Sequence, residues 1–465
     1  MIAMTNHFDT AEQIHHASLE LLRDPGVRLE HDEILQLAIT RGARRGSGAQ
    51  VVRIPREMVE EALALCPRQF ALCNRSGRPI ELSAEGESCF WSVPGMSIWK
   101  GGRHRPFTSC DMAEMARLLD QMENVGVIFG MAMEDVPPFA RDVIGLKIMA
   151  LNSHKHLRVL CFSSQGAETL KFLKPVVGDY PWFSIGFTAH GPLRWTSLAL
   201  DIFKNTAGCG IPTTINGEPM AGVSAPITLA GAAAVGNAEI LAGIVINQLL
   251  EPGRPCIYNL GLAHIFDMRT AIAVTGAPEN ALMAGASALM GRYYQLPSAS
   301  WVSTEAMLPD SQAALEKMFS FHTHLSSGVS CIWGVGQLES ELTFSPAQAV
   351  IDNEMISYIK GFQRGFHVDC DTLALELVRE VGIAGSFLET AHTLARCRTE
   401  FFYPSISCRT RRSQWEHDGA KRLDETAEEV ADSLICASVD NGLSPDQRRE
   451  LELIAESFLR RAASP

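Results

Sequence analysis

The residues best suited to chemistry in this sequence are aromatic and amide side chains that follow short apolar runs of the chain. Those expected to line a binding site are Trp333, Trp301, Tyr258, Asn259, Phe162 and Gln337. Glu218 and His190 follow two further runs and are the candidates for a catalytic role. Aromatic faces attract positive charge, and a quaternary ammonium has no N–H to donate, so this set favours a site for an organic cation.

Each of these residues also has a purely structural interpretation. Trp301 and Trp333 follow apolar runs and are equally compatible with core packing. Tyr258 could be buried with its hydroxyl satisfied by a neighbour. His190 stands in the segment FTAHGPLRW, where a loop histidine is as suited to holding a turn as to contacting a substrate. The sequence alone leaves these alternatives open.

Metal ligation has little support in the spacing of histidines and cysteines. His322 and His324 lie two positions apart in an amphipathic run, where side chains of a helix diverge. The twelve cysteines include no C-x-x-C pair. We therefore expect no tightly bound metal.

Composition narrows the class of protein. The net charge is −13 and the basic residues are scattered, which argues against nucleic acid as a partner. Uninterrupted apolar stretches stay shorter than the roughly 20 residues of a membrane span, so no membrane association is expected. The first 22 residues lack the basic and apolar regions of a signal peptide, which predicts a cytoplasmic protein with reduced cysteines.

The elements that position the candidate residues repeat eight times, each time as a short β-rich run followed by a longer amphipathic run. The predicted strands are Cys89–Val93, Gly126–Met131, Arg158–Phe162, Phe183–Thr188, Pro212–Ile215, Pro255–Asn259, Ala299–Ser303 and Ser330–Trp333. The predicted helices are Asp111–Met122, Arg141–Asn152, Glu168–Val176, Thr196–Thr206, Thr228–Leu250, Asp267–Tyr294, Asp310–Leu325 and Pro346–Arg364. Alternation of this kind implies parallel strands joined by helical crossovers.

Eight such units predict the α/β class and a closed (β/α)8 TIM barrel. The main alternative, a doubly wound sheet, normally has a G-x-G-x-x-G turn after its first strand, and this sequence has none. Residues 1–85 are predicted to form a mainly helical N-terminal cap, 86–365 the barrel, and 366–465 a C-terminal helical extension packed on the barrel.

Several motifs carry a resemblance to a known family. Residues 219–258, PMAGVSAPITLAGAAAVGNAEILAGIVINQLLEPGRPCIY, resemble the trimethylamine methyltransferase family, in which P-x-T-L-A-G leads into N-A-E-x-L-A-G-I and a P-G-x-P turn. The segments VRIPREMVEEALALCP, GRHRPFTSCDMAE and SPAQAVIDNEM are similar to other parts of that family, in the same order. The resemblance therefore covers nearly the whole chain.

The resemblance implies a barrel enzyme that passes a methyl group from an amine to the cobalt of a cobalamin-type corrinoid carried by a separate protein. Founding members carry pyrrolysine at a position that aligns near Gly334–Gly336, where this chain has ordinary residues. Relatives without pyrrolysine are associated with quaternary amines such as glycine betaine, proline betaine or carnitine. This chain is thus expected to resemble a glycine betaine methyltransferase.

Roles for individual residues follow from placement at strand ends. We expect Trp333, Trp301 and Tyr258 to flank the ammonium and Glu218 to offset its charge. His190 or Asn259 is expected to hydrogen-bond a betaine carboxylate.

One motif departs from the family pattern. Residues 391–400 read AHTLARCRTE, where the family often has H-T-x-x-H-F-R-x-E, so Arg396 and Cys397 replace the second His and the Phe. If this segment contacts another subunit or the corrinoid protein, the identity of the partner is in question. A homo-oligomer is expected. Two other functions stay open: a non-catalytic quaternary-amine-binding protein, and a metal-dependent hydrolase or lyase on the same barrel.

Overall fold

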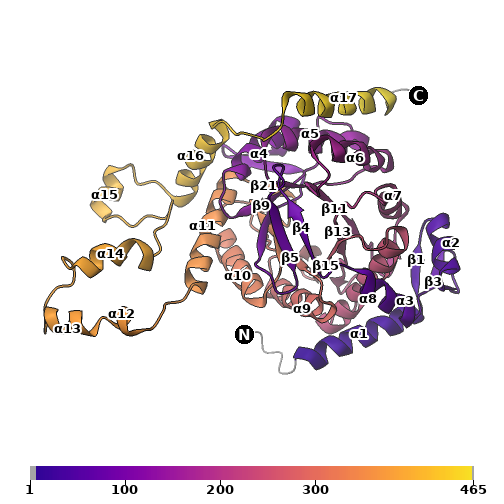
Figure 1. The fold of residues 1–465 in the computed structure, drawn as a ribbon, viewed down its shortest axis with the longest axis horizontal. Helices are drawn as coiled ribbons and strands as arrows, with labels where there is room; N and C mark the ends of the chain where they lie inside the picture. Colours follow the sequence, from indigo (N-terminus) through magenta and orange to yellow (C-terminus); the bar gives the residue numbers. More distant parts are fainter. Residues whose placement is uncertain (1–6, 463–465) are drawn as a thin grey trace.

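A closed barrel of eight parallel strands forms the centre of the molecule, as predicted (Figure 1). The computed structural model describes residues 7–462. Residues 1–6, which belong to the segment predicted not to be a signal peptide, lie outside this range. In barrel order the strands are β6 (Cys89–Ser92), β9 (Val125–Phe129), β10 (His156–Arg158), β11 (Phe183–Thr188), β13 (Thr213–Asn216), β15 (Cys256–Gly261), β18 (Ser298–Trp301) and β19 (Cys331–Val335), after which β19 pairs with β6.

Eight helices surround the barrel and connect its strands. They are α4 (Ser109–Asp120), α5 (Arg141–Asn152), α6 (Ser164–Val177), α7 (Ser197–Asn205), α8 (Leu229–Leu250), α9 (Pro278–Tyr294), α10 (Ser311–Ser327) and α11 (Pro346–Gln363). Local sequence sets their starts. Thr108 and Asp111 form a reciprocal capping box at α4. The Asp310 carboxylate accepts the Gln312 backbone N–H at 2.9 Å at the start of α10.

Two predicted boundaries were wrong. The predicted helix Asp267–Tyr294 begins only at Pro278, because the preceding residues form the antiparallel pair β16 (His264–Asp267) and β17 (Ile272–Val274). Proline fixes φ and lacks an N–H, which suits the first turn of a helix. The predicted strand Arg158–Phe162 is in fact β10, which ends at Arg158, so residues 159–162 form the loop above the strand.

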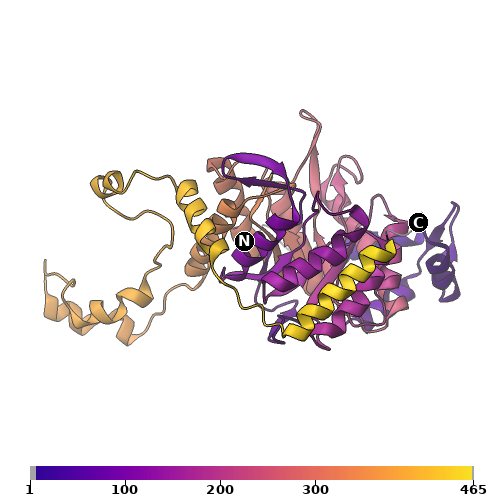
Figure 2. The ribbon, with the colours of Figure 1, turned by 90° about the horizontal axis from the view of Figure 1, so that it is seen from above.

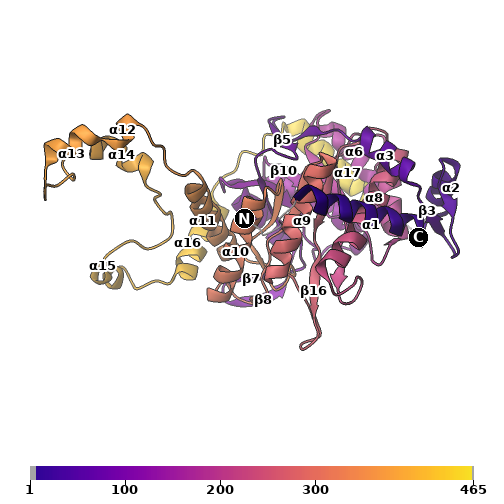
Figure 3. The same cartoon turned by 90° about the horizontal axis from the view of Figure 1, so that it is seen from below.

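Both ends of the barrel carry additional elements. The hairpin of β4 (Gln69–Cys73) and β5 (Pro79–Ser83) closes the amino end, where Leu72 and Leu82 pack with the barrel interior. The hairpins β16–β17 and β7–β8 (Ser97–Lys100 and Arg103–Pro106) project on the opposite side, which is the carboxyl end (Figure 3). Two short strands, β20 (Gln337–Leu338) and β21 (Thr343–Phe344), extend the β7–β8 sheet.

The rest of the N-terminal region lies outside the barrel. Its elements are α1 (His7–Arg23), β1 (Val27–Leu29), α2 (Asp32–Thr40), β2 (Arg44–Arg45), β3 (Val51–Arg53) and α3 (Arg56–Leu65). Helices α1 and α3 both pack on α8. Strand β1 pairs with the two-residue strand β12 (Arg194–Trp195), which ties the cap to the loop after β11.

Helix α8 is long and apolar enough to cross a membrane by length and composition, but 83% of its most apolar window is buried inside the protein. A helix that is apolar on all sides is expected where neighbours cover it completely. Here the barrel, α1 and α3 provide that cover.

The C-terminal region divides into two parts. Helices α16 (Leu423–Cys436) and α17 (Pro445–Ala462) pack on the outside of the barrel, against α11 and α4 and against α6 and α5 (Figure 2). Between α11 and α16, residues 366–422 project away from the molecule as an arm (Figure 1). The arm contains α12 (Cys370–Leu373), α13 (Leu375–Val381), α14 (Ala391–Glu400) and α15 (Arg412–His417). No residue of the arm is buried.

Candidate active site

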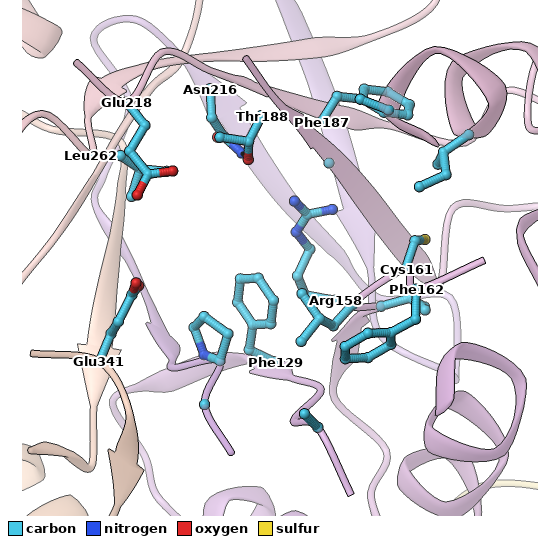
Figure 4. A pocket seen from close by; sticks show the side chains of 18 of the residues that line it. Phe129, Arg158, Cys161, Phe162, Phe187, Thr188, Asn216, Glu218, Leu262 and Glu341 are labelled. Carbon is cyan, nitrogen blue, oxygen red and sulfur yellow. Dashed lines mark hydrogen bonds between the residues drawn. The ribbon is translucent and has the colours of Figure 1, made fainter. Parts of the chain in front are cut away.

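A cavity of about 380 Å³ opens at the carboxyl ends of the barrel strands. Strand-end loops carry the reactive groups in barrels of this kind. The cavity is lined from all eight strands or the loops that follow them, and its centre is flanked by both acidic and basic side chains (Figure 4). Its size is in the range of small-molecule sites, roughly 300–1,000 Å³.

Aromatic side chains form much of the cavity wall. Trp333, Trp301 and Phe162, all predicted from the sequence, line it. The indole of Trp333 stacks on that of Trp91 with ring centroids 5.6 Å apart, and the edge of Phe129 approaches it at 5.3 Å. These contacts fix the orientation of the Trp333 ring, so a flat π face is preorganised beside the cavity.

One side of the cavity is acidic. The carboxyl groups of Glu218, in the loop after β13, and Glu341, in the loop after β20, point toward the same space (Figure 4). Burial raises the pKa of Glu218 to about 7. Burial, and then the neighbouring Glu218, raise the pKa of Glu341 well above its ordinary value. No cationic side chain of the described residues offsets either carboxyl group.

A third buried carboxyl group stands near Glu218. Glu239, on α8, accepts the Leu193 backbone N–H at 2.8 Å through one oxygen, while its other oxygen has no partner among residues 7–462. Burial is the main cause that raises the pKa of Glu239 to about 7, and Glu218 adds to it. Carboxyl groups gathered in this way are unfavourable when ionised unless a cation enters.

The opposite side of the cavity is basic. The guanidinium of Arg158, at the end of β10, reaches the cavity centre (Figure 4). It lies 5.2 Å from the ring centroid of Phe129 and 5.9 Å from that of Trp333. Burial lowers the pKa of Arg158 to about 9, so the group keeps its charge at neutral pH.

A row of hydrogen bonds supports the cavity floor beside Arg158. The Asn259 amide donates to Asn216 Oδ1 at 2.9 Å, and the Asn216 amide donates to Thr188 Oγ1 at 3.0 Å. Because Thr188 accepts this bond, its own O–H is free to donate into the cavity. Asn259 does not line the cavity and acts on it through Asn216.

Two more of the predicted site residues lie outside the cavity. Tyr258 points outward from the barrel, and its hydroxyl donates to Asn237 Oδ1 at 2.8 Å beneath α8. Adjacent side chains of a strand face opposite sides, so Ile257 occupies the interior and Tyr258 cannot. The predictions that Tyr258 and Gln337 contact the ligand were therefore wrong: Gln337 is buried against Ser303 outside the cavity.

His190 lines the cavity but is exposed at its mouth. Its backbone N–H donates to Arg194 O at 2.9 Å, so the residue also holds a turn, the second of the two roles that the sequence left open. Glu218 is the predicted catalytic residue that the structure places inside the cavity.

Sequence reasoning missed Arg158 and Glu341. The predicted strand begins at Arg158, whereas β10 ends there; the lone arginine within the apolar run HLRVLCF is the signal that marks it. Glu341 lies in the loop between β20 and β21, ten residues after Cys331, the first residue of β19. The pairing of β20 with β21 brings this loop to the cavity. Across residues 7–462, three or more His, Cys, Asp or Glu side chains nowhere gather closely enough to hold a metal ion.

Comparisons with known proteins agree over the length of the chain. A sequence model of the trimethylamine methyltransferase family matches residues 3–464. A trimethylamine methyltransferase from Desulfitobacterium hafniense is 31% identical over 436 residues, which cover 91% of this chain and 87% of that protein. A glycine betaine methyltransferase from the same species is 28% identical over 427 residues, covering 88% and 87%.

Solved structures show the same fold. The monomethylamine methyltransferase of Methanosarcina barkeri superposes with a TM-score of 0.54 at 14% identity, covering 91% of this chain and 87% of that one. The match over almost all residues, together with the barrel and its strand-end cavity, confirms the resemblance found in the sequence. The chain belongs to the trimethylamine methyltransferase family and is a methyltransferase built on a (β/α)8 barrel.

Proposed function

We propose that this protein removes a methyl group from a quaternary amine of the glycine betaine, proline betaine or carnitine type and passes it to Co(I) of a corrinoid on a separate protein. The observation that carries this proposal is the acidic side of the cavity, where Glu218 and Glu341 have no cationic partner among the described residues. A glycine betaine methyltransferase among the relatives supports the same substrate class.

A permanent cation suits this acidic side better than a protonated amine. Buried carboxylates are costly unless a positive charge offsets them. A quaternary ammonium cannot lose its charge by giving a proton to Glu218, whose pKa of about 7 would make it an acceptor. Trp301 adds an aromatic face that attracts the methylated nitrogen without hydrogen bonds, whereas the ring of Trp333 stacks on Trp91 and lies 5.9 Å from the Arg158 guanidinium.

The chemistry asks the protein mainly for binding and orientation. A Co(I) corrinoid, when bound, supplies an electron pair to the methyl carbon while the C–N bond breaks and its pair stays on nitrogen as a neutral tertiary amine. The leaving amine needs no proton, so no general acid is required. Glu218 and Glu341 hold the nitrogen and Trp301 restricts its rotation, so that one methyl group is oriented toward the mouth of the cavity.

The mouth of the cavity has the character of a docking surface for the partner protein. Large apolar side chains are exposed in the loops or helix starts that follow six barrel strands; they are Met96, Leu198, Val223, Ile227, Met268, Ile272, Met307, Leu308 and Leu342. Exposed apolar residues around a site mark an interaction surface. A corrinoid is a second substrate delivered from outside, and an apolar rim suits its large flat ring.

A second copy of this chain is the partner that we assign to the arm. The arm projects away from the barrel (Figure 1) and exposes apolar side chains, so a second copy bound to it would leave the carboxyl ends of the barrel strands free for the corrinoid protein. We place the protein in the cytoplasm, where thiols such as those of its twelve cysteines stay reduced.

The test combines the purified chain, Co(I) cobalamin and glycine betaine. We expect dimethylglycine to form while the Co(I) absorption decreases, at a rate that requires the protein. Binding of glycine betaine without methyl transfer, to free cobalamin or to corrinoid proteins, would identify a non-catalytic binding protein instead. A turnover that ends on chelation of a stoichiometric metal would favour the hydrolase or lyase alternative.

A further inference from the structure

Arg158 is a buried cation for which the described part of the chain offers no counterion. Its exposed fraction is 3%, and its Nε and Nη1 atoms have no hydrogen-bond acceptor among residues 7–462. The groups that raise its pKa are two neutral thiols, Cys161 and Cys331, and no carboxylate is among them. The guanidinium nevertheless faces the cavity (Figure 4).

Two other fully buried basic side chains have partners within the protein. Arg254 donates to Ile211 O and to Thr206 Oγ1, both at 3.0 Å. Lys317 forms an ion pair with Asp352 at 2.7 Å. Removing a guanidinium from water without a partner is strongly unfavourable. The exception at Arg158 therefore indicates that its partner is a ligand.

The neighbouring strand is shaped around this guanidinium. A Cβ atom added to Gly186, on β11, would lie 1.7 Å from Arg158 Nη2, so glycine leaves room for the guanidinium in its present position. The adjacent Thr188 hydroxyl accepts from Asn216 and keeps its proton for a ligand. Two kinds of donor thus converge on the same part of the cavity.

We propose that Arg158 binds the carboxylate of the substrate and makes the enzyme specific for zwitterionic quaternary amines. This inference rests on the proposed function and narrows it. The cavity has an anion-binding side at Arg158 and a cation-binding side at Glu218 and Glu341 (Figure 4). A betaine carries one group for each side: its carboxylate would pair with Arg158, and its ammonium would face Glu218 and Glu341. Arg158 thus replaces His190 and Asn259 as the residue that we expect to bind the betaine carboxylate.

Zwitterion recognition predicts a clear order of affinity. Choline has the quaternary ammonium but no carboxylate, and 3,3-dimethylbutyrate has the carboxylate with a neutral carbon in place of nitrogen. A site built around a buried charge rejects an analogue that lacks the matching group, here by at least about 100-fold. We expect glycine betaine to bind more tightly than either analogue by that factor, measured by titration calorimetry.

The variant Arg158→Met separates the two charges. We expect it to lose about 100-fold in affinity for glycine betaine and to stop binding 3,3-dimethylbutyrate, with affinity for choline unchanged. Arg158→Lys, which keeps the charge but not the planar fork, should recover part of the loss. Replacing an unpaired buried charge by an apolar side chain is expected to leave the melting temperature unchanged or higher.

Arg254→Met is the matched control, because it removes another buried arginine that lies outside the cavity. It should lower the melting temperature while the affinity ratio of the three ligands stays the same. Equal losses for choline and glycine betaine in Arg158→Met, or equal binding of both by the natural protein, would overturn the inference. A different result would contradict the proposed function, that the substrate is a quaternary amine. In that case 3,3-dimethylbutyrate would bind as tightly as glycine betaine, and its binding would still require Arg158.

Discussion

At the scale of single residues, the charge of Glu218 destabilises the free protein and stabilises its complex with a cation. Its carboxyl group is enclosed by the protein and has two carboxyl neighbours, Glu239 and Glu341, rather than a cation. Groups that bind ligands are often unfavourable in the unliganded fold, since they are optimised for the partner. The charge of Glu218 should therefore have a measurable effect on both the free energy of unfolding and the affinity for a cation.

We predict that Glu218→Gln stabilises the free protein at pH 8 by up to about 3 kcal/mol and weakens cation binding. The pKa of Glu218 is about 7 in the folded protein against an ordinary value of 4.5. Between these values the folded state keeps a proton that the unfolded state has lost, so the free energy of unfolding falls as pH rises from 4.5 to 7. Urea denaturation at pH 5 and pH 8 measures the difference.

The increase in the free energy of unfolding of Glu218→Gln should be large at pH 8 and small at pH 5. The control is Glu61→Gln, at an exposed residue, for which no increase is expected. A gain of the same size at both pH values would contradict an ionisation effect. The natural protein should also bind choline more weakly as pH falls below about 7, because protonation removes the charge of Glu218. Glu218→Gln should lack this pH dependence.

At the scale of elements, the eight strand–helix units were predictable because each apolar strand lies between turns and each helix has its own start signal. Side-chain direction was less predictable. Because β10 ends at Arg158 and not at Phe162, Arg158 was not predicted to lie at a strand end. The outward direction of Tyr258 depends on the register of its strand in the barrel, which the sequence of one strand does not define. The acidic partner Glu341 depends on a long-range pairing of β20 with β21.

The backbone of β19 also leaves no room at Gly334 for the large residue that founding members of the family carry near Gly334–Gly336. Gly334 has φ +118°, and a Cβ atom there would lie 2.0 Å from Val302 O. Lys317 Nζ donates to Gly334 O and to Gln337 O, both at 2.9 Å, and its ion pair with Asp352 is fully buried. This clamp holds the backbone in a path that excludes side chains at Gly334.

We predict that Gly334→Ala destabilises the protein by at least about 2 kcal/mol more than Gly253→Ala, measured by chemical denaturation. Both glycines have positive φ, so both substitutions carry the same kind of backbone cost, roughly 1–2 kcal/mol. A Cβ atom at Gly253 has no neighbour within 4 Å among the described residues, whereas that at Gly334 meets Val302. Equal losses in the two variants would show that the segment can move away.

At the scale of the whole molecule, the barrel is complete within one chain, while the arm of residues 366–422 is not. Its contacts with the rest of the chain lie at its base, where Glu354 accepts the Ser405 backbone N–H at 2.9 Å and Tyr358 packs on the edge of Phe402. The departure from the family motif, AHTLARCRTE, is α14 and belongs to this arm. The sequence predicted helices there but not that they leave the barrel.

The arm exposes many large apolar side chains. Its exposed large apolar side chains are Phe366, Val368, Leu373, Leu375, Val378, Ile383, Phe387, Leu388, Leu394, Phe401 and Tyr403. Beside its base, α10 and α11 expose Leu315, Phe319 and Phe362. A corrinoid protein that leaves after every methyl transfer would return this surface to water each time. A second copy with its arm against the α10–α11 face would cover both surfaces permanently through one two-fold axis.

We predict that the natural protein is a dimer or larger assembly at micromolar concentration and that Ile383→Lys/Leu388→Lys/Leu394→Lys shifts it to a monomer, measured by light scattering. Charged side chains in a desolvated contact oppose association, while the barrel does not depend on them. The variant should keep its binding of glycine betaine. Leu453→Lys, on the outer face of α17, is the control and should leave the assembly unchanged. A monomeric natural protein, or an assembly that survives three lysines, would require another occupant for the arm.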